Sequence, residues 1–264
     1  MIRTIRGMAA AAVLALAVGC TDSTGPLIAP GQRSITDDVA RDANETTALD
    51  LEQVALDEAF AALTPVFPRT PACSYSSVVE RFLCPTVVTA QGITIQRSFA
   101  VFGRGSAQTA YDPVTTDSVN FQVYRTGSIG GPTRTVWLNQ SRNTTISGLA
   151  GAETERIWNG TGTRADSMLT TENGVTRLVR IGSVDRISGL RFAVPRSTNP
   201  FPLRGTITHD VTVTTVTSNA NGAQSRTATR HVEITFDGTR TAQMRIGTQL
   251  CTLDLQTRAV SCTR

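Results

Sequence analysis

The stretch that decides the fold is RGTITHDVTVTTVTSNANGAQSRTATRHVEITF, residues 204–236. In its first half, apolar residues such as Ile207, Val211 and Val213 occupy every second position and alternate with polar ones. A period of two predicts a β-strand with one buried face. Residues 219–222 (NANG) are a turn signal, after which polar and apolar residues alternate again. The stretch therefore predicts a long antiparallel β-hairpin.

The same alternation recurs over most of the chain. Val119, Phe121 and Val123 alternate with polar residues, and no helical pattern interrupts the region. Roughly 190 residues of this pattern suit one domain. We therefore predict an all-β domain over residues 65–264, a single large antiparallel meander built as a barrel, a half-barrel or a two-sheet sandwich. Turn signals that separate the expected strands lie at residues 90–92, 130–132, 172–174, 219–222 and 237–238.

The composition excludes several chemistries. All 25 basic residues are arginine, so mechanisms that need a lysine, such as a Schiff base or a P-loop, are ruled out. Threonine occurs 41 times and histidine twice, which favours strands over catalytic clusters. No GxSxG motif is present, and the glycine-rich stretches lack the strand-to-helix context of phosphate loops. We expect no cofactor.

The amino terminus predicts export. Two arginines precede an apolar run, residues 8–18, that is too short to span a bilayer. The run ends in Ala17-Val18-Gly19-Cys20, which resembles the lipobox of bacterial lipoproteins. The resemblance implies that residues 1–19 are a signal peptide and that Cys20 receives lipid, including a fatty acid such as palmitate. Thr21 follows the cysteine, and in the sorting rule of some lipoproteins this favours the outer membrane over the inner one.

Two further segments precede the β domain. Residues 20–46 are rich in polar residues, glycine and proline, and are expected to form a flexible tether. Residues 47–64 predict one short amphipathic helix, because Leu49, Leu56, Phe60 and Leu63 share a narrow arc. Residues 20–63 carry a net charge of −7 and residues 64–264 a net charge of +9. We expect the helix to pack on the β domain, with its acids facing arginines.

The cysteines predict a disulfide framework. With Cys20 assigned to lipid, Cys73, Cys84, Cys251 and Cys262 remain. They allow three connectivities, and spacing favours the local one, Cys73 with Cys84 and Cys251 with Cys262, because each pair flanks a stretch that can fold back with apolar residues opposed. A four-cysteine zinc site would need much closer pairs. Export would place the thiols in an oxidising compartment, where disulfides persist.

The hairpin 204–236 holds the only candidate metal or acid-base site. With Asn221-Gly222 as the turn, Asp210 lies opposite Glu233 and His231 opposite Thr212. A slip of two residues would instead pair Asp210 with His231, and Asp210, His231 and Glu233 share one face in either register. A weak cation site is one interpretation, and an ordinary exposed ion pair is the favoured one. His209, on the apolar face, is expected to be half-buried and bonded to the backbone.

An arginine-rich stretch suggests a partner. Nucleic acid is not expected, because an exported protein seldom meets it and no interleaved aromatic residues offer stacking platforms. An anionic envelope glycan or lipid headgroup fits better, and plain solubility is the simplest alternative. The arginines concerned are Arg177, Arg180, Arg186, Arg191, Arg196 and Arg204.

Together these features predict an exported, lipid-anchored protein of the cell envelope, in the periplasm or at the outer membrane, that acts as a non-catalytic binding or structural module rather than an enzyme. Two alternatives remain. One is a carrier of an apolar or lipidic ligand, held in a cavity lined by residues such as Val119, Phe121 and Val123. The other is a metal-assisted hydrolase built on Asp210, His231 and Glu233.

Overall fold

The computed structural model describes Val39 and residues 73–263, which belong to one compact unit, Ser34–Arg264. The signal peptide, the lipidation site Cys20, the helix predicted over residues 47–64 and all of the tether except Val39 lie outside the described residues. In the part of the chain that the structure describes, no helix is long and apolar enough to cross a membrane.

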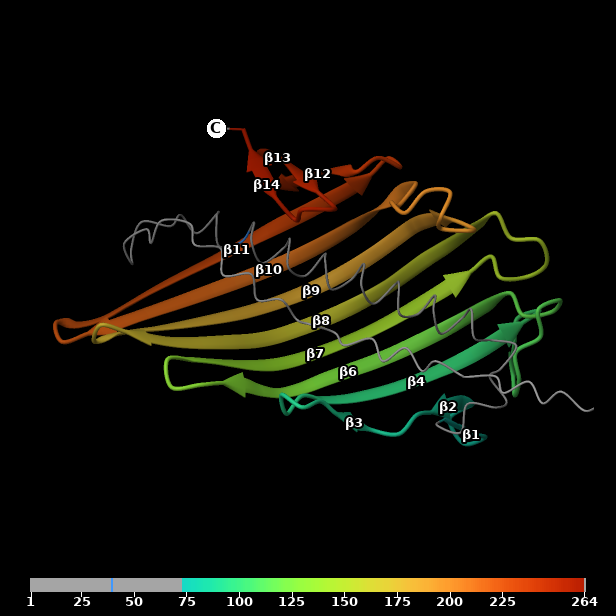
Figure 1. The fold of residues 1–264 in the computed structure, drawn as a ribbon, viewed down its shortest axis with the longest axis horizontal. Coiled ribbons are helices and arrows are strands. Elements are labelled where there is room, and N and C mark those ends of the chain that lie inside the picture. Colours follow the sequence, from blue (N-terminus) through green and yellow to red (C-terminus); the bar gives the residue numbers. More distant parts are fainter. Residues whose placement is uncertain (1–38, 40–72, 264) are drawn as a thin grey trace, which may run out of the picture. The chain divides into compact units, whose positions relative to one another are not determined.

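The described chain folds into one antiparallel sheet, as the alternation predicted (Figure 1). Its order is β1-β2-β4-β6-β7-β8-β9-β10-β11-β12-β13-β14, with β3 and β5 paired to β4. This order follows the chain and has two ends, β1 and β14, as expected of a meander. The strands are β1 (Ser74–Ser76), β2 (Arg81–Leu83), β3 (Val87–Val88), β4 (Thr94–Gly103), β5 (Ser106–Gln108), β6 (Ser118–Gly130), β7 (Arg134–Ser147), β8 (Glu155–Glu172), β9 (Val175–Ala193), β10 (Arg204–Asn219), β11 (Gly222–Phe236), β12 (Thr241–Ile246), β13 (Gln249–Asp254) and β14 (Val260–Cys262).

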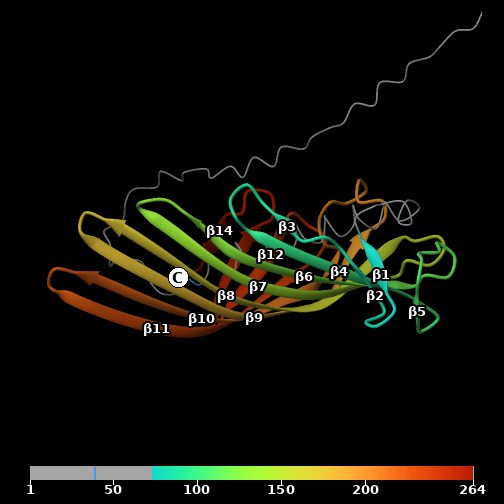
Figure 2. The ribbon, with the colours of Figure 1, turned by 90° about the horizontal axis from the view of Figure 1, so that it is seen from below.

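The sheet has two unlike faces. We call the face that carries Phe121, Ile146, Ile207 and Ile234 the inner face, because these side chains are buried, and the opposite one the outer face. The long strands bend along their length, as Figure 2 shows. Alternation along the strands places mostly apolar residues on the inner face and mostly polar ones, with threonine, serine, asparagine and arginine prominent, on the outer face.

The inner face forms one hydrophobic core. Trp158, Leu190 and Phe192 are almost fully buried in it. Val119, Phe121 and Val123, the proposed lining of a carrier cavity, are also buried. Val39, which falls in the predicted tether, is completely buried and belongs to the same apolar cluster.

The two disulfides are those favoured from spacing. Cys73 bonds to Cys84, beside the β1–β2 hairpin, and Cys251 bonds to Cys262 across β13 and β14. The expected apolar pairs are present too, because Tyr75 opposes Phe82 and Leu253 opposes Val260. Each disulfide therefore closes a hairpin, one at each end of the strand order.

The hairpin β10–β11 forms, but its first expected register is wrong. Asn219 pairs with Gly222, so the turn is Ala220-Asn221 rather than Asn221-Gly222. The Asn219 side chain accepts a hydrogen bond from the main-chain N–H of Asn221 at 2.9 Å and stabilises this earlier turn. Moving the turn by one residue shifts the pairing by two, so Asp210 lies opposite His231, as in the alternative register.

Candidate functional site

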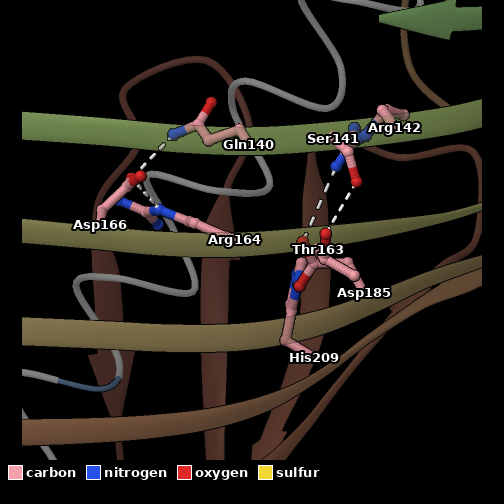
Figure 3. Close-up of polar contacts among 8 residues, drawn as sticks. All are labelled: Gln140, Ser141, Arg142, Thr163, Arg164, Asp166, Asp185 and His209. Carbon is pink, nitrogen blue, oxygen red and sulfur yellow. Dashed lines mark hydrogen bonds and ion pairs between the residues drawn. The ribbon is translucent and has the colours of Figure 1, made fainter. Parts of the chain in front are cut away.

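A polar network crosses the inner face between β7 and β10 (Figure 3). At its centre, the Nδ1 of His209 on β10 lies 2.8 Å from the Oδ1 of Asp185 on β9. The two residues are register partners, so their side chains leave the sheet side by side. Both are buried, His209 completely. The prediction of a half-buried His209 is therefore wrong, and a carboxylate on the next strand bonds its ring.

Gly162 allows a third residue to join this pair. Gly162 on β8 lies between Arg142 on β7 and Asp185 on β9 in the strand register. Since glycine has no side chain, Arg142 reaches across β8, and its Nη2 lies 3.9 Å from the Oδ2 of Asp185. A Cβ at Gly162 would lie 3.4 Å from each of these two atoms and 3.2 Å from the main-chain oxygen of Ser141.

The electrostatics of Asp185 follow from these contacts. Burial by itself raises the pKa of the carboxyl group, because it disfavours the charged form. The hydrogen bond from His209 and the charges of His209 and Arg142 outweigh burial, so the pKa of Asp185 lies below its usual range. Asp185 is thus held as a carboxylate inside the core.

A second polar group lies beside the first on the same face. Asp166 on β8 pairs with Arg164 and accepts a hydrogen bond from the Nε2 of Gln140 at 2.8 Å. Its other oxygen accepts the main-chain N–H of Asn139 at 3.0 Å. With these partners the buried carboxylate of Asp166 is well satisfied. The whole network is therefore suited to holding β7–β10 in register, as buried polar groups with complete partners do.

Sequence reasoning missed this network, although a signal was present. Ser183, Asp185 and Ile187 alternate on β9 with exposed residues, so Asp185 belonged to the buried face. Finding its true partners needed the registers of three strand pairs at once.

The candidate metal or acid-base site lies on the outer face. The Nδ1 of His231 is 2.7 Å from the Oδ1 of Asp210, and both side chains are more than half exposed. Glu233 instead bonds Arg245 on β12, at 2.5 Å. Among the described residues, no group of three or more histidine, cysteine, aspartate or glutamate side chains is placed to hold a metal ion. Asp210 and His231 form a pair without a third ligand.

The arginine-rich stretch is divided by the fold. Arg191 and Arg204 both approach Glu155, and Arg196 lies over the ring of Phe192. Arg180 and Arg186, by contrast, are exposed on the outer face of β9. Within the described chain no carboxylate lies in ion-pair distance of either. These two arginines are available to an anionic partner.

Aromatic side chains are also exposed on this face. Trp137 on β7 is 41% exposed and Tyr124 on β6 is 49% exposed. The strand register places Trp137, Ser167 of β8 and Arg180 of β9 in one row. Tyr124, Ser141, Thr163 and Val184 form another row. The outer face therefore combines aromatic rings, free guanidinium groups and hydroxyl groups on one exposed surface.

Comparison with known proteins found no family model, no curated protein and no solved structure that matches the chain. Function is therefore inferred from the geometry of the chain itself.

Proposed function

We propose that the chain is an exported lipoprotein of the bacterial cell envelope, anchored through Cys20, and that it works as a non-catalytic binding module. Its binding surface is the outer face of the sheet, and its partner carries negative charge. The observation that carries this proposal is the pair Arg180 and Arg186, two exposed guanidinium groups without a carboxylate partner in the described chain, on a face that also exposes Trp137 and Tyr124.

The two Asp–His pairs support binding rather than catalysis. A catalytic acid or base must reach a substrate, yet His209 is completely buried within the core. His231 is accessible, but it has only the exposed Asp210 beside it. The disulfides support export, because such bonds persist in oxidising compartments. The lipobox-like Cys20 supports an anchor, which needs more than one acyl chain to be stable.

The anchor is tested by labelling. The full chain is expressed in a bacterium that processes lipoproteins, in the presence of radioactive palmitate, beside the variant Cys20→Ser. We expect label in the membrane-bound wild-type protein and none in the variant. Equal labelling of the two would show that Cys20 is not the lipidation site.

The binding surface is tested by charge reversal. Two non-lipidated proteins are compared, Cys20→Ser and Cys20→Ser/Arg180→Glu/Arg186→Glu, so that acyl chains do not bind the vesicles by themselves. Both are run in native gels that contain polygalacturonate, and both are sedimented with vesicles of phosphatidylglycerol. We expect the first to bind at least one of these anionic probes and the charge-reversed protein to lose most of that binding. A Cys20→Ser protein that binds neither probe would contradict the proposed function.

A further inference from the structure

We infer that the row formed by Trp137, Ser167 and Arg180 on the outer face is a subsite for one acidic sugar unit of a glycan chain. The sugar ring stacks on the indole of Trp137, and its carboxylate binds the guanidinium group of Arg180. This inference rests on the proposed function, since it names the ligand of the same outer face.

The register gives the subsite its dimensions. Trp137 pairs with Ser167, and Ser167 pairs with Arg180, so the three side chains leave the same face of neighbouring strands β7, β8 and β9. Neighbouring strands lie about 4.8 Å apart, which separates the Cα atoms of Trp137 and Arg180 by roughly 9.6 Å. Both are exposed, whereas Ser167 between them is only partly so. Large exposed side chains therefore stand at the two ends of the row, with a small side chain between them.

Small residues also lie beside Ser167. The next row contains Ala165 on β8 and Gly182 on β9. A Cβ added at Gly182 would meet no atom within 4 Å, so the space above this residue is open. The space beside Ser167 is therefore open to a ligand that contacts both the indole and the guanidinium group.

The chemistry of the two ends selects the ligand. An indole offers a large, rigid apolar ring that remains exposed here, and the C–H face of a sugar ring is a matching surface. A guanidinium group binds a carboxylate through two parallel hydrogen bonds. The carboxylate of Asp210, on the neighbouring strand β10, does not compete, because it is hydrogen-bonded to His231.

The rest of the face favours a glycan over a lipid. Hydroxyl and amide side chains lie beside the subsite, among them Ser128 and Thr214 in its own row and Asn139 in the next one. An acyl chain laid across them would remove them from water without offering hydrogen bonds, whereas the hydroxyl groups of a glycan can bond them. Apolar residues do border the subsite, but Leu169, Leu178 and Val216 are only partly exposed.

The test uses two polysaccharides that differ only in charge. Full-length, detergent-solubilised protein is titrated by affinity electrophoresis with polygalacturonate and with its fully methyl-esterified form, which keeps the sugar ring but removes the charge. We expect the wild type to bind polygalacturonate about tenfold more tightly than the ester. Trp137→Ala should weaken binding to both by about tenfold. Arg180→Gln should weaken binding to the charged form only, and so abolish the discrimination.

A matched control lies on the opposite side of the sheet. Arg226→Gln removes an exposed arginine of β11 that shares its side of the strand with the buried Val232 and Ile234. This variant should stay within about twofold of the wild type. Gly182→Glu should weaken binding to polygalacturonate more than Gly182→Gln does, because its carboxylate occupies Arg180. Thermal unfolding of each variant checks that the fold is intact.

The outcomes separate the subsite from the proposed function. If the wild type binds polygalacturonate but Trp137→Ala and Arg180→Gln bind as tightly, the subsite is wrong while binding by the outer face stands. If the non-lipidated Cys20→Ser protein binds vesicles of phosphatidylglycerol but neither polysaccharide, the ligand is a lipid and the inference is overturned. If it binds no probe at all, the subsite and the proposed function fail together.

Discussion

The two faces of the sheet each hold one Asp–His pair, and the pairs differ almost only in their surroundings. Asp185 and His209 on the inner face are 2.8 Å apart with side chains 4% and 0% exposed. Asp210 and His231 on the outer face are 2.7 Å apart with side chains 67% and 56% exposed. Equal distances do not imply equal energies, because water screens the outer pair and not the inner one. Burial, rather than the distance between the two groups, therefore sets how much such a contact contributes to stability.

Two glycines, Gly162 and Gly182, differ between the two faces in a similar way. Gly162 faces inward and leaves room for Arg142 to reach Asp185, whereas Gly182 faces outward over open space. Gly162 leaves the space in which Arg142 approaches Asp185. At Gly182, no atom of the described residues would contact an added Cβ, so packing does not require a glycine there. A glycine on the outer face of a strand is therefore a candidate for function, since it weakens the strand without a structural reason.

Removing the two aspartates should give the largest difference. Asp185→Ala leaves Arg142 and His209 without their shared carboxylate in the core, and we expect it to lower the free energy of unfolding by about 3 kcal/mol or more. Asp210→Ala, with its pair in water, should change it by less than about 1 kcal/mol. Urea unfolding followed by circular dichroism measures both, and equal losses would break the comparison.

Filling the two glycines should give the next largest difference. Gly162→Val forces its side chain against Arg142 and Asp185, and should cost about 1–3 kcal/mol. Gly182→Val enters open space on a strand and should be neutral or stabilising by up to about 1 kcal/mol. The melting temperatures of the two variants provide the measurement, and a destabilised Gly182→Val would mean that the outer face is packed.

The pH dependence of stability should identify the buried carboxylate. The pKa of Asp185 is lower in the folded state than in the unfolded state, so the unfolded state binds more protons between the two values. The stability that Asp185 contributes is present above its unfolded pKa of about 3.9 and is lost as the pH falls through the folded value. We expect Asp185→Asn to flatten the fall in stability below about pH 4. An unchanged acid profile would contradict this assignment.

Removing a hydrogen bond between two threonines on the outer face should have the smallest effect on stability. The hydroxyl groups of Thr212 and Thr229, on β10 and β11, are 3.0 Å apart in an exposed position. Thr212→Val removes the hydrogen bond but keeps a β-branched side chain, so stability should change by less than about 0.5 kcal/mol. A larger loss, seen in urea titrations, would indicate that outer-face hydroxyl groups stabilise the sheet rather than serve a ligand.

Much of the fold was predictable, and the inner network was not. The strands follow from alternation along one segment, and each disulfide follows from two cysteines that flank a single hairpin. The Asp185 network needs the pairing of β7 with β8, β8 with β9 and β9 with β10, and a two-residue error in any of them separates its members. The error made for β10–β11 came from a turn displaced by one residue.

The inferred outer subsite is an intermediate case. In the sequence Trp137 alternates with Val136 and Leu138, so its ring lies on the other face of the strand from theirs. Arg180 is one of the six arginines grouped in the sequence. Only the register showed that Arg180 shares a row with Trp137, while Arg191 and Arg204 turn to Glu155.

By itself, the sequence determined which stretches are strands, which of their faces is buried and which cysteines bond, because these properties depend on the backbone period and on neighbours within one hairpin. The tertiary structure alone decided which residues meet across strands: Asp185 with His209 and Arg142 inside, and Trp137 with Arg180 outside. The physical reason is that each strand pair has its own register, set by its turn and by packing, and contacts across three or four strands depend on all of these registers together.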